Sequence, residues 1–287
     1  MSFLVAAVQL QSTSNEAHNL DTAAALIERA ASYGARLAAT PENTNFLGPH
    51  EDKVRGAQPL DGPVCARFAE LARKHSMYVL LGSFNERNEQ AAATTAVTAG
   101  VGGAAVAKLG RCNNTSVLFG PGGEQVAVYR KIHLFDVDVS EDVRFKESAT
   151  IAPGSEVVVA PTEVGTLGLS VCYDLRFAEL YRALVEKGAQ IITVPSAFTL
   201  MTGKDHWYAL LRARAIETQC YVIAPAQSGK HDDRGLRHSY GHSIVIDPWG
   251  QVIGAASDGP GLALAEIDLE RVARVRKQIP VADHRRL

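Results

Sequence analysis

Apolar segments rich in β-branched residues recur along the chain, and several are too continuously apolar to keep one face in water. They occupy residues 3–10, 78–84, 166–172, 189–195, 220–226 and 242–248. Runs of this length and composition are typical of strands that are buried on both faces. The chain is therefore expected to fold around sheets that are covered on both sides.

Between these segments, apolar residues follow a helical period. Residues 20–31 and 207–215 each place apolar side chains at helical spacing, which gives an α-helix one apolar stripe. Asp268 precedes residues 269–278 in the position of a helix N-cap. Strands that alternate with helices predict an α/β fold. No shift in composition marks a linker, so residues 1–287 are expected to form one domain.

The charges are balanced and interspersed. The 287 residues carry 29 basic and 31 acidic side chains, a formal net charge of -2, without any long run of like charge. We therefore expect a small-molecule substrate and neither a nucleic-acid partner nor a membrane. The first residues enter a strand pattern without the basic start and cleavage site of a secretory signal, which indicates a cytoplasmic protein.

The cysteines argue against a metal or disulfide framework. Cys65, Cys112, Cys172 and Cys220 are widely separated and form no CxxC pair, so neither zinc nor a disulfide scaffold is expected. Residues 91–109 are rich in Ala, Gly and Thr, and their glycines disfavour a membrane helix. We predict a loop or hairpin there, inserted at the surface.

Cys172 lies where a strand pattern changes into a helical one. Residues 168–180, GLSVCYDLRFAEL, run from an apolar strand into a predicted helix. This arrangement exposes a nucleophile at the carboxyl end of a strand. It also directs free backbone N–H groups, including that of Tyr173, at a group bound to the sulfur. The alternative is that Cys172 is a small buried hydrophobic residue, as cysteines at strand ends usually are.

Two further segments place a charged residue at the end of an apolar run. In residues 37–43, LAATPEN, the run stops at a proline that Glu42 follows. In residues 126–136, VAVYRKIHLFD, strand alternation puts Tyr129 and Lys131 on one face. Taken singly, Glu42 is equally compatible with a surface or capping acid, and Lys131 with a solvated lysine. The combination of the three segments is the specific signal.

In order and spacing, residues 41–43, 129–136 and 170–180 resemble the Glu–Lys–Cys signature of the nitrilase superfamily. The resemblance continues through residues 196–207, 210–227 and 240–250. It therefore covers nearly the whole chain. It implies a four-layer αββα sandwich, no metal and no organic cofactor, and association through helices into a homodimer or a larger homo-oligomer.

These residue types together suit the hydrolysis of an unactivated amide. Cys172 can attack the carbonyl carbon, while Glu42 takes the thiol proton and passes it to the leaving amine. Lys131 and the Tyr173 N–H can stabilise the oxyanion, and water can then hydrolyse the thioester. By the resemblance, Glu147 is a second glutamate that orients Lys131 and the substrate. The alternative for Glu147 is an exposed loop acid.

The resemblance is greatest to the Nit branch of the superfamily. It implies a small ω-amide of a keto acid as substrate, in which a 2-oxoglutarate-like acyl group is joined to Cys-Gly. The monoamide 2-oxoglutaramate is an alternative substrate. A true nitrilase acting on small nitriles and a non-catalytic interaction protein are the other hypotheses, and the presence of the trio disfavours the latter.

Arg176 is the predicted host of a substrate carboxylate. If the segment after Cys172 is α-helical, the i to i+4 spacing returns its guanidinium to the side of the sulfur. Phe198, Thr199 and Thr202 are expected near the same group. The alternative is that Arg176 pairs with an acid of its own helix, Glu179 or Asp174.

Other residues with chemical potential are interpreted as structural. His133 and His206 raise the possibility of a Cys–His protease, but the sequence around Cys172 does not resemble one. Arg214 and Glu217 are spaced for an ion pair on one helix face. Cys220 starts an apolar run and is expected in the core.

Overall fold

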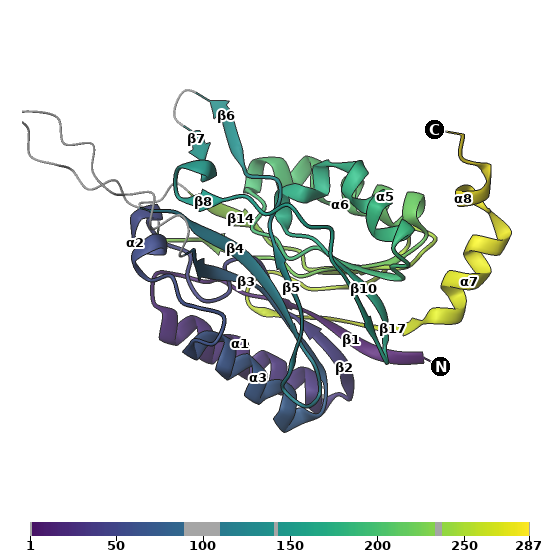
Figure 1. Cartoon of the computed structure of the whole chain (residues 1–287), viewed down its shortest axis with the longest axis horizontal. Helices are drawn as coiled ribbons and strands as arrows, with labels where there is room; N and C mark the ends of the chain where they lie inside the picture. The colour runs from purple at the N-terminus through teal and green to yellow at the C-terminus, as the bar shows by residue number, and fades with distance from the viewer. Residues whose placement is uncertain (1, 89–109, 141–142, 233–236, 287) are drawn as a thin grey trace, which may run out of the picture.

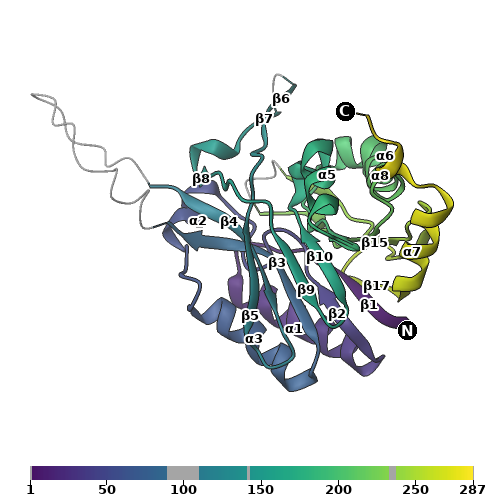
Figure 2. The same cartoon turned by 45° about the vertical axis from the view of Figure 1, so that its right-hand side comes forward.

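Two mixed sheets pack face to face, and helices cover the outer face of each (Figures 1 and 2). This is the four-layer αββα arrangement that the resemblance implies. The structure is a computed structural model that describes residues 2–88, 110–140, 143–232 and 237–286. The loop or hairpin predicted at 91–109 lies outside these residues.

The first sheet contains a parallel core with antiparallel flanks. Its strands in spatial order are β17 (Gly261–Asp268), β1 (Ser2–Gln9), β2 (Ala35–Ala39), β3 (Tyr78–Arg87), β4 (Cys112–Phe119) and β5 (Gln125–Arg130), and β8 (Ile151–Ala152) also pairs with β4. Strands β1, β2 and β3 are parallel. Strand β4 is antiparallel to both β3 and β5, so β5 runs in the direction of β3.

The second sheet repeats this plan. Its strands in spatial order are β16 (Val252–Ala255), β15 (Ile244–Ile246), β12 (Tyr221–Ala224), β11 (Ile191–Thr193), β10 (Gly165–Leu169) and β9 (Val159–Thr162). Strands β10, β11 and β12 are parallel. Two short ribbons stand apart: β6 (Asp136–Ser140) with β7 (Val143–Lys146), and β13 (Ser228–Lys230) with β14 (His238–Tyr240).

Helices α1 (Glu16–Ser32) and α3 (Pro63–His75) cover the first sheet, and α5 (Ala178–Glu186) and α6 (Leu200–Thr218) cover the second (Figure 1). The short helix α2 (His50–Arg55) lies near β8, and α7 (Leu269–Gln278) and α8 (Val281–His284) follow β17 in the chain. The Asp268 side chain accepts a hydrogen bond from the Glu270 N–H, so the predicted N-cap is confirmed. No helix in the described ranges is long and apolar enough to cross a membrane.

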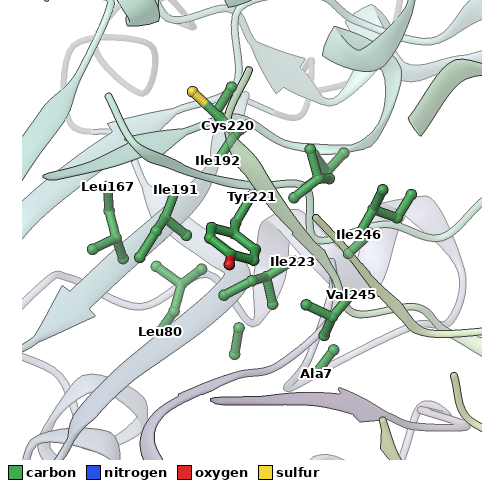
Figure 3. Close-up of a cluster of buried hydrophobic side chains, with 14 of the residues drawn as sticks. Ala7, Leu80, Leu167, Ile191, Ile192, Cys220, Tyr221, Ile223, Val245 and Ile246 are labelled. Carbon is green, nitrogen blue, oxygen red and sulfur yellow. The ribbon is translucent and has the colours of Figure 1, made fainter. Parts of the chain in front are cut away.

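The continuous apolar runs of the sequence have a direct structural cause. In β1, Val5 and Ala7 belong to the core that both sheets share, whereas Ala6 and Val8 pack with residues of α1 and α3. Neighbouring side chains therefore point to opposite faces, and both faces are dry. Figure 3 shows the shared core, where side chains of the two sheets meet, among them Ala7, Leu80, Leu167, Ile191, Tyr221 and Val245.

The strand directions bring distant parts of the chain to one edge of the molecule. Strands β2 and β5 end shortly before Glu42 and Lys131, and β10 and β11 end shortly before Cys172 and Ala197. A hydrogen bond between Glu42 and Ala197 shows that these strand ends meet. Carboxyl ends of parallel strands are the usual place for a site in such sheets.

Candidate active site

Glu42 is held on a tight turn after β2. The next residue, Asn43, has a φ of 56°, and its N–H donates to Ser83 Oγ at 2.9 Å. The Glu42 carbonyl accepts from Gln227 Nε2 at 2.9 Å, and its Oε2 accepts from the Ala197 N–H at 3.0 Å. Both the backbone and the carboxylate are therefore fixed, and the side chain is buried.

Lys131 follows β5 and bridges two carboxylates while only 1% exposed. Its Nζ donates to Glu42 Oε1 at 2.9 Å and to Glu147 Oε2 at 2.9 Å. Asn114 of β4 donates from Nδ2 to the same two residues, at 2.8 Å to Glu42 and 3.3 Å to Glu147. The four side chains form one buried polar cluster. Within it, the positive charge of Lys131 lies between the negative charges of Glu42 and Glu147.

The charges of this cluster stabilise one another. Burial alone would lower the pKa of Lys131, but the carboxylates of Glu147 and Glu42 hold that pKa well above its ordinary value. Burial likewise opposes ionisation of Glu147, whereas the Lys131 ammonium and the Phe135 N–H lower the pKa of its carboxyl. Lys131 and Glu147 are therefore both charged at neutral pH.

The backbone at Cys172 differs from the predicted strand-to-α-helix junction. Strand β10 ends at Leu169, Cys172 opens a 3₁₀ helix that runs to Arg176, and α5 begins only at Ala178. Cys172 itself has a φ of 49°, a left-handed conformation that costs a non-glycine residue on the order of 1 kcal/mol. Its N–H donates to the Pro195 carbonyl at 2.9 Å, which anchors the strained residue to the end of β11.

The thiol of Cys172 requires a base. Burial and the adjacent Glu42 carboxylate raise its pKa well above the ordinary value, and the Lys131 ammonium offsets this only in part. The thiol is therefore protonated at neutral pH. Glu42 lies beside the sulfur and is in position to receive the proton.

Asp174 connects the Cys172 turn to the segment that carries Lys131. Its fully buried carboxylate accepts from the Tyr129 hydroxyl at 2.6 Å and from the Val171 N–H at 2.8 Å. It also lies 3.0 Å from the His133 backbone nitrogen and 2.7 Å from its Nδ1. Because Tyr129 and His133 flank Lys131 in sequence, this network fixes the Cys172 turn relative to the Lys131 ammonium. His133 lies in this network and stacks on the Phe177 ring.

One open cavity is lined in part by the turn that carries Cys172. Its lining comprises Glu42, Asn43, Lys131, Phe135, Phe145, Glu147, Cys172, Tyr173, Arg176, Ala197, Phe198, Thr199, Thr202, Arg237, His238 and Ser239. Every site residue predicted from the sequence is in this set. Thr199 caps α6 and shares a 2.8 Å hydrogen bond with Thr202, hydroxyl to hydroxyl.

Arg176 reaches the cavity although the α-helix expected to carry it is absent. Its guanidinium carbon lies 5.8 Å from the centre of the Tyr173 ring and 5.4 Å from that of Phe198, and Nη2 lies 3.2 Å from His206 Nδ1. Within the described ranges it forms no ion pair with Glu179 or Asp174. Arg176 therefore presents a cation between two aromatic rings of the cavity wall.

Several residues of the site were not predicted from the sequence. Asn114 belongs to β4, CNNTSVLF, where every residue is buried although the first half is polar. The sequence signal that could have indicated Asn114 is the polar run inside an otherwise apolar strand pattern, because buried polar groups require hydrogen-bond partners. Residues 237–239 line the cavity because this segment pairs with a distant one. Ser239 forms an isolated antiparallel β-bridge with Thr199, and the Tyr240 N–H donates to the Phe198 carbonyl at 2.9 Å.

A buried thiol beside a carboxylate and an ammonium, in an αββα sandwich, defines a class of hydrolase. A family model for carbon-nitrogen hydrolases matches residues 4–277. The chain belongs to the carbon-nitrogen hydrolase family, and the resemblance to the nitrilase superfamily is confirmed. It is an enzyme that hydrolyses amide carbon–nitrogen bonds.

Relatives of high similarity share one name. Over 285 residues the chain is 43% identical to the deaminated glutathione amidase of Bos taurus, covering 99% of this chain and 82% of that protein. It is 42% identical to the deaminated glutathione amidase of Synechocystis sp. (strain PCC 6803 / GT-S), covering 99% and 98% of the two chains.

Solved structures agree with this placement. The NitFhit protein of Caenorhabditis elegans superposes with a TM-score of 0.88 at 38% identity; the match covers 99% of this chain and 65% of that one. Nit3 of Saccharomyces cerevisiae, a member of branch 10 of the nitrilase superfamily, gives a TM-score of 0.83 at 30% identity, covering 100% and 97%.

Proposed function

We propose that this enzyme is an amidase for deaminated glutathione, which it cleaves to 2-oxoglutarate and Cys-Gly through a thioester on Cys172. The observation that carries the proposal is the position of Lys131 Nζ, 2.9 Å from Glu42 beside the Cys172 thiol. A base, a nucleophile and a cation for the oxyanion are thereby gathered at one point of a cavity. The names of the relatives supply the substrate.

Acylation begins when Glu42 takes the thiol proton and the Cys172 sulfur attacks the amide carbon. The carbonyl oxygen becomes an oxyanion, which Lys131 and the Tyr173 N–H stabilise. Collapse of this intermediate breaks the C–N bond. Glu42 gives its proton to the departing nitrogen, so the amine leaves neutral and the acyl group remains as a thioester.

Deacylation repeats these steps with water as the nucleophile. Glu42 takes a proton from a water molecule that attacks the thioester carbon, and the second oxyanion meets the same donors. The C–S bond breaks, the carboxylic acid leaves, and the sulfur regains a proton. Glu147 keeps Lys131 in place throughout, since both oxygens of its carboxylate accept hydrogen bonds from the ammonium.

The acyl part of the substrate explains the other polar residues of the wall. A 2-oxoglutaryl group carries a carboxylate several bonds from the scissile carbonyl. Arg176, between the rings of Tyr173 and Phe198, offers it a planar pair of donors, and Thr199 and Thr202 offer hydroxyls beside it. This arrangement favours a keto-acid amide over an uncharged nitrile.

The test is a panel of substrates read by mass spectrometry. Deaminated glutathione, 2-oxoglutaramate and a small aliphatic nitrile are incubated with the enzyme, and both the product and the mass of the Cys172 peptide are measured. We expect the highest kcat/KM for deaminated glutathione and an acyl adduct on Cys172. A higher kcat/KM for 2-oxoglutaramate would assign the enzyme to monoamides, and preference for the nitrile would reject amidase function.

A further inference from the structure

Asn43, the residue after Glu42, lines the cavity with a side chain that is bound at one end only. Its backbone N–H donates to Ser83 Oγ at 2.9 Å, and its carbonyl accepts from Gln227 Nε2 at 3.3 Å. Its Oδ1 accepts from Lys53 Nζ at 3.1 Å. In the part of the chain that the structure describes, Asn43 Nδ2 has no hydrogen-bond partner.

Lys53 determines which end of the Asn43 amide is left for the cavity. Lys53 lies on α2 and is only 4% exposed. Burial lowers its pKa to about 8, so its side chain is mainly a charged ammonium at pH 7, and an ammonium can only donate. The amide atom next to Lys53 Nζ must therefore be the oxygen, and the amide nitrogen lies at the other end of the planar group.

The Asn43 amide nitrogen is accessible to a ligand. Across the described ranges, it is not among the side-chain atoms that are both enclosed and without a partner. It therefore meets open space, and the cavity beside Cys172 is the open space that Asn43 lines. Because Lys53 already fixes the direction of this donor, little further ordering is needed when a ligand binds.

The turn after β2 keeps this donor beside the proposed base. Gln227 Nε2 donates to the carbonyl of Glu42 at 2.9 Å as well as to that of Asn43 at 3.3 Å, so one side chain holds both residues. Asn43 has a φ of 56°, a left-handed conformation that asparagine adopts more readily than most residues. The carboxylate of Glu42 and the amide of Asn43 therefore line the cavity as neighbours.

We propose that Asn43 is a specificity residue for the leaving group, and that its Nδ2 donates to the first carbonyl oxygen of that group. The inference rests on the proposed function, in which Glu42 protonates the departing nitrogen, so this nitrogen lies at Glu42. In Cys-Gly the cysteinyl carbonyl carbon is two bonds from that nitrogen, about 2.5 Å away. A donor on the residue next to the base has the spacing to meet its oxygen.

This contact divides amide substrates by their leaving group. An amide that releases an amino acid or a peptide carries a carbonyl at this place, whereas a monoamide that releases ammonia carries none. With a monoamide bound, Asn43 Nδ2 gains no partner from the substrate. A site built to hydrogen-bond a group rejects analogues that lack it. The preferred substrates are therefore amides formed with the amino group of an amino acid or a peptide.

The first test uses wild-type enzyme and three amides of the same 2-oxoglutaryl group. Their leaving groups are Cys-Gly, cysteinamide and cysteamine, and release of 2-oxoglutarate is measured for each. Cysteinamide keeps the carbonyl without the glycine carboxylate, and cysteamine lacks both. We expect kcat/KM for the cysteinamide compound to exceed that for the cysteamine compound by at least about fivefold, because cysteamine leaves the donor unpaired.

The second test removes the donor. Asn43→Gly deletes the amide at a left-handed position that glycine adopts without strain. It should lower kcat/KM by at least about fivefold for the two substrates that carry the carbonyl. The cysteamine compound and 2-oxoglutaramate, which share the acyl group, should lose less than about twofold. Asn43→Asp keeps the size and the contact with Lys53 but replaces the donor with an oxygen, so it should show the same selectivity.

Two lysine variants provide a matched comparison. Lys53→Met leaves the Asn43 amide free to turn, so it should cause a smaller loss that is again confined to the substrates with the carbonyl. Lys74→Met removes an ammonium from α3 that pairs with Glu28 outside the cavity, and it should change neither class of substrate.

The outcomes separate this inference from the proposed function. Equal losses on all substrates in Asn43→Gly would show that Asn43 only supports the turn, which would overturn its role in specificity and leave the amidase function standing. Equal wild-type rates on the cysteinamide and cysteamine compounds would do the same, even if Asn43→Gly fails to fold. A wild-type enzyme that hydrolyses 2-oxoglutaramate but none of the larger amides would overturn the proposed function and this inference together.

Discussion

The carboxylate of Glu42 accepts a hydrogen bond of 3.0 Å from the backbone N–H of Ala197. Glu42 follows a strand of the first sheet and Ala197 follows a strand of the second, so this bond joins the two halves of the sandwich at the reacting centre. The other carboxylate oxygen is held by Lys131 and Asn114. The proposed base is therefore oriented before substrate arrives, which is how a site avoids reorganisation during the reaction.

Glu42 and Lys131 should behave as one unit in a double-mutant cycle. Glu42→Gln removes the base and Lys131→Met removes the oxyanion cation, and each should lower kcat/KM by about a thousandfold or more. The double variant should be hardly worse than either, since both residues serve one transition state. Losses that multiply would show that they act independently. Arg130→Met, in the neighbouring pair with Glu86 outside the cavity, is the matched control.

Asp174 should matter more to stability than any one of its partners. Asp174→Asn replaces one carboxylate oxygen with an amide N–H₂ that must face a backbone N–H, that of Val171 or that of His133, and we expect the unfolding free energy to fall by about 3 kcal/mol. Tyr129→Phe removes a single hydrogen bond from the same carboxylate and should cost about 1 kcal/mol. Equilibrium denaturation in urea measures both. Similar losses for the two variants would mean that Asp174 has no bridging role.

Lys53 gives a pH dependence of stability with a defined sign. Burial, with a smaller contribution from Arg237, lowers the pKa of Lys53 from 10.5 to about 8. Between these values the unfolded chain binds a proton that the folded chain lacks, so stability contributed by this position rises with pH. Below pH 8 the cost of burying the ammonium is present in full.

The measurement compares wild type with Lys53→Met from pH 7 to pH 10.5. The unfolding free energy of wild type should rise relative to the variant by at most about 3 kcal/mol across this window. Lys277→Met, at an exposed position on α7, should show no such trend. A constant difference between wild type and Lys53→Met would contradict a buried, titrating ammonium at this position.

Much of the scaffold was predictable because burial on both faces leaves a clear signal in sequence. The runs at 3–10 and 78–84 became β1 and β3, and the helical stripes at 20–31 and 207–215 fall in α1 and α6. The prediction was wrong at residues 166–172, where the strand was expected to continue to Cys172. The strand ends at Leu169, because the chain turns into a left-handed conformation at Cys172, which long-range contacts such as the Cys172–Pro195 hydrogen bond impose. The local apolar pattern does not reveal this turn.

The site was predictable only in part. Glu42, Lys131 and Cys172 came from a resemblance that links three distant segments. Asn114 did not, because it looks like an ordinary polar residue until the strands are paired. Its contacts depend on which strands lie beside it, and a single sequence does not contain that information in any local pattern.

Arg176 should select for a carboxylate on the acyl side. Arg176→Lys keeps the charge but loses the planar fork, so kcat/KM should fall by about tenfold or more for ω-amides with an α-carboxylate. Uncharged amides of the same length should lose much less. Paired assays on the two kinds of amide make the comparison. If both fall equally, Arg176 supports the wall through Tyr173 and Phe198 and the carboxylate binds elsewhere.

The central claim is that Cys172 is the nucleophile, and the activity of Cys172→Ala tests it most directly. The substitution removes one sulfur atom from a residue anchored through its backbone, so the fold should persist, as circular dichroism and the melting temperature will show. Amide hydrolysis should become undetectable, because the proposed acyl intermediate forms on this sulfur atom. Amidase activity that stays within about tenfold of wild type in this folded variant would contradict the account.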